Sequence, residues 1–281
     1  MNLTNLSAIR EIADKFGFTF SKSLGQNFLI NPSVCPRIAE MGGADENTGV
    51  IEIGAGFGVL TQELAKRAKK VVAVELDSRL IPVLQYTLAD YDNVKVINED
   101  VLKVDLPKLI AEEFPGMEVV VCANLPYYIT SPIIMALLEQ RLPIKAVTVM
   151  VQKEAGDRLC APMPSRGCGA VTAAVRYYSE PKVLFPVSRG SFCPAPNVDS
   201  MVIRLDVKDA LPLEPEEEKK LFRVVKAAFG QRRKTLPNTL SAGLGISKAE
   251  AAEKLAAAGL KPTARAEELS MEQFCRLAKE F

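Results

Sequence analysis

Short apolar runs rich in β-branched residues recur along the first half of the chain. Their lengths are typical of strands, and apolar residues at helical spacing fill most of the gaps between them. This alternation is typical of an α/β fold with a doubly wound, mainly parallel sheet. The predicted strands are Val50–Ile53, Val71–Val74, Val94–Ile97, Val119–Ala123 and Val147–Val151.

Two further β-rich runs follow, Val183–Val187 and Met201–Val207. The stretch between them contains Pro and Gly and has no helical pattern. We expect the two runs to form an antiparallel pair at the end of the sheet, which makes about seven strands.

The composition changes after Val207, where prolines flank an acidic stretch and no strand pattern follows. We therefore predict a sheet domain over residues 1–207, with an N-terminal extension over 1–30. Residues 208–281 are predicted to form a small all-helical domain.

Serines mark several predicted helix starts, and Gly259 is placed to end one of these helices. A serine followed three residues later by Glu or Gln forms a capping box, which marks the start of a helix. A proline in the first helical position also indicates a helix start. The predicted starts are Ser247 with Glu250, Ser270 with Gln273, and Ser131 as the N-cap before Pro132.

The composition excludes several kinds of chemistry. Of the 281 residues, 48% are hydrophobic and 25% are charged, which is ordinary for a globular protein. The chain has no histidine, which rules out a Ser-His-Asp triad, a Cys-His pair, a histidine base and a His-ligated zinc. Any catalysis must rely on carboxylates, amides, hydroxyls, cationic side chains or a cofactor, and we expect no metal site.

The six cysteines form no C-x-x-C pair, which favours reduced thiols in a cytoplasmic protein. The N-terminus lacks the continuous apolar core of a signal peptide, and no apolar run approaches the ~18 residues that a membrane span needs. We therefore expect a cytoplasmic protein without a membrane partner, and nothing in the sequence demands more than a monomer.

A glycine-rich turn follows the first predicted strand. Gly54, Gly56 and Gly58 lie between Val50–Ile53 and a helical pattern. In such a turn a ligand can approach the backbone closely and meet the N–H groups of the helix. Glu75 ends the next strand, 21 residues after Gly54, where its carboxylate can accept both hydroxyls of a ribose. These residues predict a pocket for an adenosine-containing cofactor.

Two cofactor classes compete for this turn. A dinucleotide site has the pattern G-x-G-x-x-G, but Val59 stands where the last glycine would be, which weakens that interpretation. A turn that only packs a helix on a strand is the alternative without a ligand. Asp100 follows the third strand and can accept a hydrogen bond from an adenine amino group, although an ordinary solvated aspartate fits equally well.

The fourth predicted strand ends in Asn124-Leu125-Pro126-Tyr127, at the edge where open α/β sheets bind ligands. Adenine N6 is a poor nucleophile because its lone pair is delocalised into the ring. The Asn124 side-chain oxygen and the Leu125 carbonyl can accept both N6 protons and favour a pyramidal nitrogen that attacks an electrophilic methyl group. Pro126 can orient that carbonyl, and the Tyr127 ring can stack on the base. A Pro-Tyr turn with a capping Asn is the structural alternative.

Five segments of the chain together carry a family resemblance. They are Leu24–Leu29, Glu52–Gly58, Asn124–Tyr127, Phe192–Ser200 and Phe229–Thr235. In this order they closely resemble the S-adenosylmethionine-dependent ribosomal RNA adenine N6,N6-dimethyltransferases, specifically the bacterial small-subunit enzymes. The resemblance implies a seven-stranded Rossmann-like methyltransferase sheet whose last strand is antiparallel, and a small helical C-terminal domain.

The resemblance also implies roles for individual residues, with S-adenosyl-L-methionine as the cofactor. Gly54 would line its methionine end, and Phe192 would stack on the target adenine opposite Tyr127. Tyr128 departs from the family, which commonly has Asn there, and this change affects the rim of the base pocket. The expected cofactor-binding residues are Asn27, Leu29, Gly54, Gly56, Glu75, Asp100 and Asn124. The expected catalytic residues are Asn124, Leu125, Pro126, Tyr127 and Phe192.

The net charge of +1 conceals an uneven distribution. Residues 219–248 carry eight basic side chains and no acidic one, so the other 251 residues carry a net charge of −7. A solvated helix face explains such a run as well as a track for RNA phosphates does, and the base-binding loop favours the RNA. We predict phosphate contacts, in a C-terminal RNA-binding domain, at Lys226, Arg232, Arg233 and Lys234.

The leading hypothesis is the transfer of methyl groups to N6 of adenosine in ribosomal RNA, twice per base. The resemblance implies two adjacent adenosines in the 3′-terminal hairpin loop of 16S rRNA in the assembling small subunit, where unpaired bases are easily splayed out. Three alternatives stay open: a large-subunit adenine methyltransferase that confers antibiotic resistance, a non-catalytic RNA-binding assembly factor, and a nicotinamide dehydrogenase. The Phe192–Ser200 and Gln231–Thr235 segments favour the small-subunit enzyme.

Overall fold

The computed structural model describes residues 2–19 and 27–281. Leu24, Gly25 and Gln26, which begin the first segment of family resemblance, lie outside the described residues. Within the described part of the chain, no helix is long and apolar enough to cross a membrane.

The chain forms two compact units. The first contains Met1–Gly156 and Lys182–Val207, and the second contains Asp157–Pro181 and Lys208–Phe281. The predicted domain boundary between residues 207 and 208 coincides with one junction of these units. The segment over residues 157–181, however, groups with the C-terminal helices and not with the sheet.

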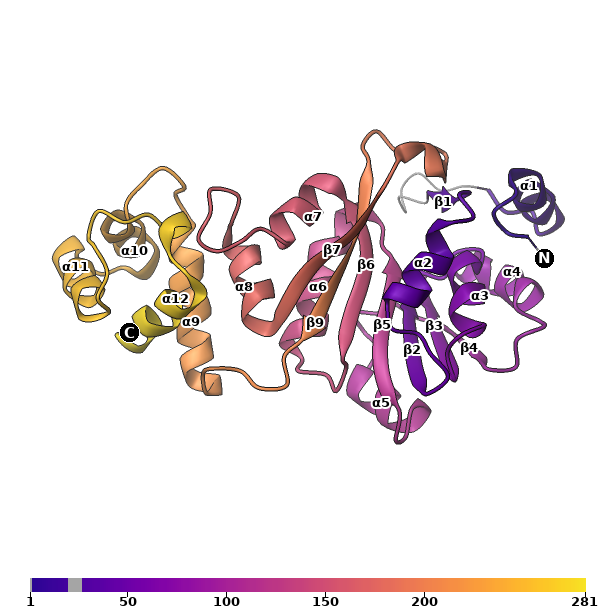
Figure 1. Ribbon diagram of the computed structural model, residues 1–281, viewed down its shortest axis with the longest axis horizontal. Helices are drawn as coiled ribbons and strands as arrows, with labels where there is room; N and C mark the ends of the chain where they lie inside the picture. Colours follow the sequence, from indigo (N-terminus) through magenta and orange to yellow (C-terminus); the bar gives the residue numbers. More distant parts are fainter. Residues whose placement is uncertain (1, 20–26) are drawn as a thin grey trace. The chain divides into compact units, whose positions relative to one another are not determined.

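A seven-stranded sheet forms the centre of the first unit, in the order β4-β3-β2-β5-β6-β9-β7 (Figure 1). The strands from β2 to β6 are parallel to one another, and β9 lies between β6 and β7 and runs antiparallel to β6. This topology confirms the predicted α/β fold with an antiparallel last strand. The strands are β2 (Thr48–Ile53), β3 (Lys70–Glu75), β4 (Val94–Asn98), β5 (Glu118–Asn124), β6 (Ala146–Gln152), β7 (Ser179–Val187) and β9 (Ser200–Val207).

The central strand β2 is buried along its whole length because helices cover both of its faces. On one face, Ile38 of α2 (Val34–Met41) and Leu64 of α3 (Val59–Ala65) belong to one apolar cluster with Val50. On the other face, the Phe114 ring, at the end of α5 (Leu106–Glu113), occupies the space that a side chain at Gly49 would need. This burial explains why β2 shows a continuous apolar run.

The helix after β5 begins earlier than its sequence predicts. Tyr127–Ile129 form a 3-10 turn, η2, that leads directly into α6 (Thr130–Glu139), so the expected N-cap role of Ser131 is wrong. Ser131 lies in the first turn instead, and the Thr130 hydroxyl donates to the carbonyl of Pro126 at 3.3 Å. Pro132 is tolerated because its missing N–H has no intrahelical acceptor in the first turn.

The other predicted helix ends are confirmed. Ser270 and Gln273 form a reciprocal capping box at the start of α12 (Met271–Lys279). The Ser247 hydroxyl accepts from the N–H of Glu250 at 3.0 Å and caps α11 (Lys248–Ala257). Gly259, with φ +72°, follows that helix in the left-handed conformation that favours glycine.

Aromatic packing explains why the segment over residues 157–181 belongs to the second unit. Tyr177 and Tyr178 end α8 (Ala170–Tyr178), and their rings lie 5.4 and 5.5 Å from the ring of Phe222 in α9 (Pro215–Ala228). Both tyrosine hydroxyls donate to the Glu218 carboxylate of the same helix. The α8 side chains therefore complete the core beneath α9, and α10 (Leu236–Leu244) follows α9 in the chain.

The N-terminal helix α1 packs on the first unit, and the other elements are short. Asn5 caps α1, whose Ile9 and Ile12 join an apolar cluster with Phe57. The remaining elements are α1 (Leu6–Lys15), β1 (Phe28–Leu29), η1 (Ser78–Leu80), α4 (Ile81–Thr87), α7 (Lys153–Leu159), η3 (Arg189–Ser191), β8 (Phe192–Cys193) and η4 (Ala266–Glu268).

Candidate active site

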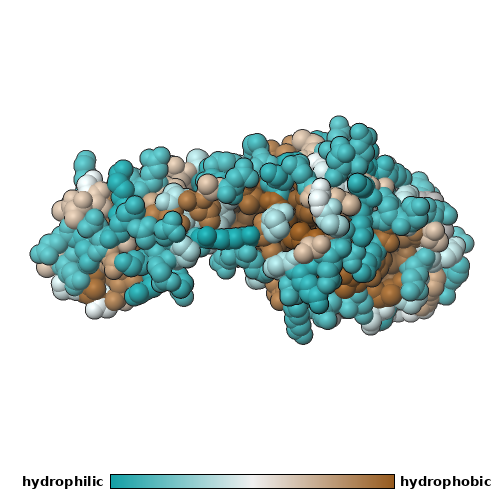
Figure 2. All heavy atoms as spheres, turned by 90° about the horizontal axis from the view of Figure 1, so that it is seen from below, coloured by the Kyte–Doolittle hydropathy of each residue, from teal (hydrophilic) through white to brown (hydrophobic). Residues whose placement is uncertain are grey.

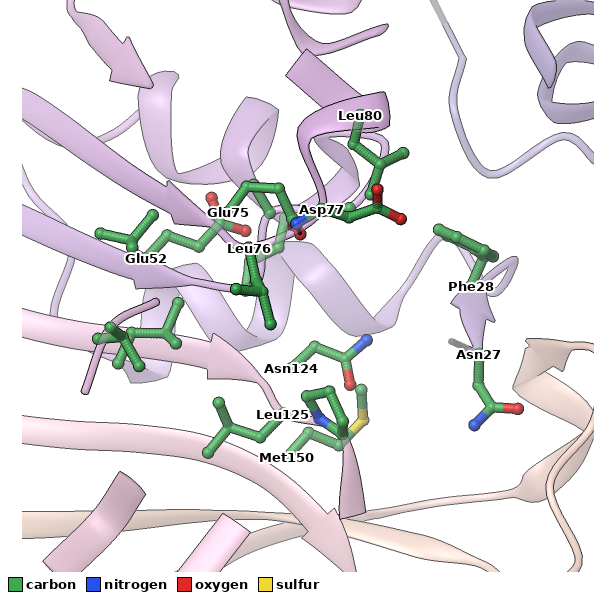
Figure 3. A pocket seen from close by; sticks show the side chains of 18 of the residues that line it. Asn27, Phe28, Glu52, Glu75, Leu76, Asp77, Leu80, Asn124, Leu125 and Met150 are labelled. Carbon is green, nitrogen blue, oxygen red and sulfur yellow. Dashed lines mark hydrogen bonds between the residues drawn. The ribbon is translucent and has the colours of Figure 1, made fainter. Parts of the chain in front are cut away.

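A pocket in the first unit lies at the carboxyl ends of β2, β3, β4 and β5 (Figure 3). It brings together all eleven residues that the sequence nominates for cofactor binding or catalysis. The eleven are Asn27, Leu29, Gly54, Gly56, Glu75, Asp100, Asn124, Leu125, Pro126, Tyr127 and Phe192.

The glycine turn forms one wall of this pocket in a conformation that other residues rarely adopt. Gly54, Gly56 and Gly58 have φ values of +77°, +59° and +88°. The N–H of Gly54 donates to the carbonyl of Val74 at 2.8 Å, which ties the turn to the neighbouring strand. The backbone therefore lines the pocket directly, with no side chain at positions 54 and 56 to hold a ligand away.

Glu75 is held in place by backbone donors on two sides. Its Oε2 accepts from the N–H of Gly56 at 2.9 Å, and its Oε1 accepts from the N–H of Asp77 at 2.8 Å. Burial raises the pKa of this carboxyl, and the two backbone hydrogen bonds oppose that shift. The carboxylate is thus an oriented acceptor with lone pairs left for two ligand hydroxyls.

Glu52 also lines the pocket, and it is not among the residues predicted to act there. Its side chain is 1% exposed, and its Oε2 has no hydrogen-bond partner among residues 2–19 and 27–281. The pKa of Glu52 is raised to about 8, chiefly by burial and also by the Glu75 carboxylate, while the Thr61 hydroxyl opposes the shift. A carboxyl of this kind is mostly neutral at pH 7. In the sequence, Glu52 could have been noticed as the one acidic residue inside the apolar run Val50–Ile53, on the same strand face as Val50.

The end of β4 and the residues after β3 close the pocket beside Glu75. Asn98 donates through Nδ2 to the carbonyl of Glu75 at 2.8 Å, which holds the two strand ends together. Asp100 Oδ1 accepts from the N–H of Leu102 at 3.1 Å, so its other oxygen faces no described donor. Leu76 lines the pocket with 54% of its side chain exposed, an apolar surface that sequence analysis also missed.

The loop after β5 forms the opposite wall. Leu125 is buried, whereas Tyr127 is half-buried and its hydroxyl hydrogen-bonds the Ser200 hydroxyl at 2.8 Å. Burial raises the pKa of Tyr127, and the hydrogen bond from Ser200 lowers it. Asn124 is the last residue of β5, between this wall and the glycine turn.

A two-stranded sheet brings Asn27 and Leu29 to the pocket. β1 pairs antiparallel with β8, and Leu29 lies opposite Phe192. The N–H of Ile30 donates to the carbonyl of Ser191 at 2.8 Å and extends this pairing. Phe192 is only 4% exposed and belongs to the apolar cluster of the first unit, so it lines the pocket from within the core.

The predicted phosphate contacts lie on the second unit. Lys226 is in the last turn of α9, and Arg232, Arg233 and Lys234 follow it; all four are exposed. Arg232 Nη2 donates to the carbonyl of Arg166 at 2.6 Å. Among residues 2–19 and 27–281, no carboxylate pairs with any of these four cations. Figure 2 shows that hydrophilic residues cover much of the visible face of this unit.

The sheet order and the position of the pocket define a Rossmann-like methyltransferase fold. The family profile described as ribosomal RNA adenine dimethylase matches residues 17–281. The chain therefore belongs to the ribosomal RNA adenine dimethylase family.

Relatives and solved structures agree with this assignment. Ribosomal RNA small subunit methyltransferase A of Geobacillus thermodenitrificans is 51% identical over 96% of this chain and 93% of its own, and that of Alkaliphilus oremlandii is 50% identical over 96% and 94%. The crystal structure of the 23S rRNA methyltransferase ErmE is similar with a TM-score of 0.70 and 27% identity, over 90% of this chain and 99% of that chain. A dimethyladenosine transferase from Plasmodium falciparum has a TM-score of 0.73 and 26% identity, over 89% and 95%.

Proposed function

We propose that this protein transfers methyl groups from S-adenosyl-L-methionine to N6 of two adjacent adenosines in the 3′-terminal hairpin loop of 16S rRNA. It acts in the cytoplasm, as a monomer, on the assembling small ribosomal subunit. The observation that carries this proposal is one pocket in which hydrogen-bond acceptors for a nucleoside cofactor face a loop suited to an adenine base.

The choice of the small subunit rests on the relatives. Proteins about 50% identical over nearly the whole chain carry a small-subunit name, whereas the 23S rRNA methyltransferase ErmE is 27% identical. The large-subunit alternative therefore has weaker support, although its fold is the same.

The residues on the cofactor side fit S-adenosyl-L-methionine, which supplies a methyl group on a positively charged sulfur. Glu75 accepts the two ribose hydroxyls, because its own oxygens are already oriented by Gly56 and Asp77. The free oxygen of Asp100 accepts from the adenine amino group of the cofactor. Gly54 and Gly56 permit close approach at the methionine end, and Leu29 of β1 and Asn27 just before it close the site.

The residues on the base side prepare the target nitrogen. The Asn124 side-chain oxygen and the Leu125 carbonyl accept hydrogen bonds from the two N6–H groups of adenine. These hydrogen bonds draw the N6 lone pair out of conjugation with the ring and direct it at the methyl group. Tyr127 stacks on the base, and the Ser200 hydroxyl holds its ring in position. Phe192 supports the other face of the base. The methylated nitrogen is a cationic, acidic centre that releases its extra proton to solvent water, so no histidine base is needed.

The test is methyl incorporation from tritiated S-adenosyl-L-methionine into small and large ribosomal subunits that lack the modification. We expect incorporation into the small subunit, approaching four methyl groups per particle because two adenosines each receive two. Incorporation only into the large subunit would support the antibiotic-resistance type of enzyme. Cofactor binding without any transfer would support the non-catalytic assembly factor.

A further inference from the structure

Tyr128 is the most exposed large hydrophobic side chain among the described residues. Its exposed fraction is 61%, and it lines the same pocket as Tyr127. The two tyrosines are consecutive residues of η2. Side chains that follow one another in a 3-10 turn diverge by roughly 120°. One turn therefore presents two aromatic rings in different directions at the base side of the pocket.

The two rings differ in what holds them. Tyr127 is half-buried and fixed by the Ser200 hydroxyl at 2.8 Å. In the described part of the chain, the Tyr128 ring contacts no other ring and no cation. Tyr86, another exposed tyrosine, lies under Lys15 Nζ at 3.6 Å and beside the Phe16 ring at 5.7 Å. The faces of the Tyr128 ring are thus available to a ligand, whereas those of Tyr86 are already used.

Extraction of a target base creates a need for such a ring. A base that moves into an enzyme pocket leaves its neighbour in the strand without a stacking partner, and this loss opposes the movement. Aromatic side chains replace lost base stacking in many single-stranded RNA complexes, without regard to sequence. An aromatic ring beside the mouth of the pocket is placed to do this.

We propose that Tyr128 stacks on the nucleobase that flanks the target adenosine and so positions the RNA strand at the mouth of the pocket. This inference rests on the proposed function, because it requires an adenosine of an RNA strand in the pocket. Tyr128 is a positioning residue that acts on the neighbouring nucleotide, and the methyl transfer itself remains with the residues of the Asn124–Tyr127 loop.

The test is steady-state methylation of small subunits that lack the modification. We expect Tyr128→Ala and Tyr128→Leu to raise KM for the subunit about 5- to 150-fold, the usual range for one lost base–aromatic contact, with kcat nearly unchanged. Tyr128→Phe should keep the wild-type KM because stacking needs the ring and not the hydroxyl. Tyr86→Ala, which removes an exposed ring elsewhere, is the matched control and should behave as the wild type.

The dissociation constant of S-adenosylhomocysteine, measured by calorimetry, separates the possible results. It should be the same for the wild type and all Tyr128 variants. A wild-type KM in Tyr128→Ala, or in Tyr128→Leu, would overturn the proposal, and so would weaker S-adenosylhomocysteine binding, which would place the ring on the cofactor. If the wild type methylates no small subunit, the proposed function itself fails, a result that the Tyr128 variants do not produce.

Discussion

The two walls of the pocket are built in different ways. On the cofactor side, both oxygens of Glu75 are held by backbone N–H groups, and the glycine turn is tied to β3 by its own hydrogen bond. On the base side, the hydrogen bond to Ser200 positions the ring of Tyr127. The neighbouring ring of Tyr128 is largely exposed to solvent. Backbone hydrogen bonds therefore orient the side proposed for the cofactor, whereas the side proposed for the base includes the exposed ring of Tyr128.

This difference separates two kinds of mutational effect. Changes in the cofactor wall should weaken the binding of a small ligand, because that wall is preorganised for it. Changes in the base wall should affect the rate of transfer or the use of RNA, and leave the cofactor affinity nearly unchanged.

The largest effect is expected at the base wall, from Asn124→Ala. The substitution removes one of the two proposed acceptors of hydrogen bonds from the adenine N6–H groups, and loss of one such oriented group typically lowers kcat about 100- to 1000-fold. Rapid-quench measurement of methyl transfer checks this. Asn47→Ala, at an exposed site of the same unit, should retain full activity. Full activity in Asn124→Ala would remove Asn124 from the mechanism.

The next effect is a pH dependence of stability caused by Glu52. The pKa of this carboxyl is about 8 in the folded protein and near its ordinary value of 4.5 when unfolded. Between these values the folded state binds one more proton, so the stability contributed by the neutral group falls as the pH rises. From pH 4.5 to pH 7 the loss is about 3 kcal/mol.

Glu52→Gln should abolish this loss, because an amide does not ionise. Urea unfolding of the wild type and the variant at pH 5, 6 and 7 measures the difference between their free energies of unfolding. We expect that difference to increase with pH in favour of the variant, while the exposed Glu46→Gln variant follows the wild type. Parallel pH curves for wild type and Glu52→Gln would show that the buried carboxyl is ionised at all these pH values.

A third effect, on the cofactor wall, is expected from Glu75→Gln. The amide replaces one acceptor by a donor that faces a backbone N–H, and the carboxylate proposed to bind the ribose loses its charge. We expect S-adenosylhomocysteine to bind about 10- to 100-fold more weakly in calorimetry. Glu118→Gln, at the exposed start of β5, serves as the control and should bind normally. An unchanged affinity in Glu75→Gln would contradict the assignment of the ribose site.

The pocket could be predicted largely from the sequence because its residues occur where strands end. Gly54, Glu75, Asp100 and Asn124 each follow a recognisable apolar run, and the carboxyl ends of parallel strands meet at one edge of a sheet. The roles of these residues remain predictions, whereas their convergence on one pocket is a structural fact. Phe192 came only from the family resemblance, since a two-residue strand such as β8 has no periodic pattern.

Other features could not be predicted because they depend on tertiary packing. Because the 3-10 turn over Tyr127–Ile129 leads directly into α6, the helix begins before Ser131. The local pattern of Ser131 followed by Pro132 predicts a later start. No sequence pattern indicates that the tyrosines of α8 pack on α9. The raised pKa of Glu52 likewise depends on burial that only the folded chain shows.

The smallest effect concerns the contribution of exposed cations in the second unit to RNA affinity. Replacing Arg232, Arg233 and Lys234 by Ala should weaken RNA binding at low salt. It should also reduce the slope of log K against log salt concentration by about 0.7 for each lost phosphate contact on single-stranded RNA. Lys219→Ala, whose ammonium already pairs with Glu216 at 2.6 Å, is the control. An unchanged slope in the triple variant would assign these cations to a solvated surface.

The most direct test of the account is the modification state of 16S rRNA in a strain that lacks this gene. Mass spectrometry of the 3′-terminal fragment should show two adjacent unmodified adenosines in the hairpin loop, and expression of the wild-type protein should restore N6,N6-dimethyladenosine at both. Dimethyladenosine that persists at these positions without the gene, or a loss confined to 23S rRNA, would contradict the proposed function.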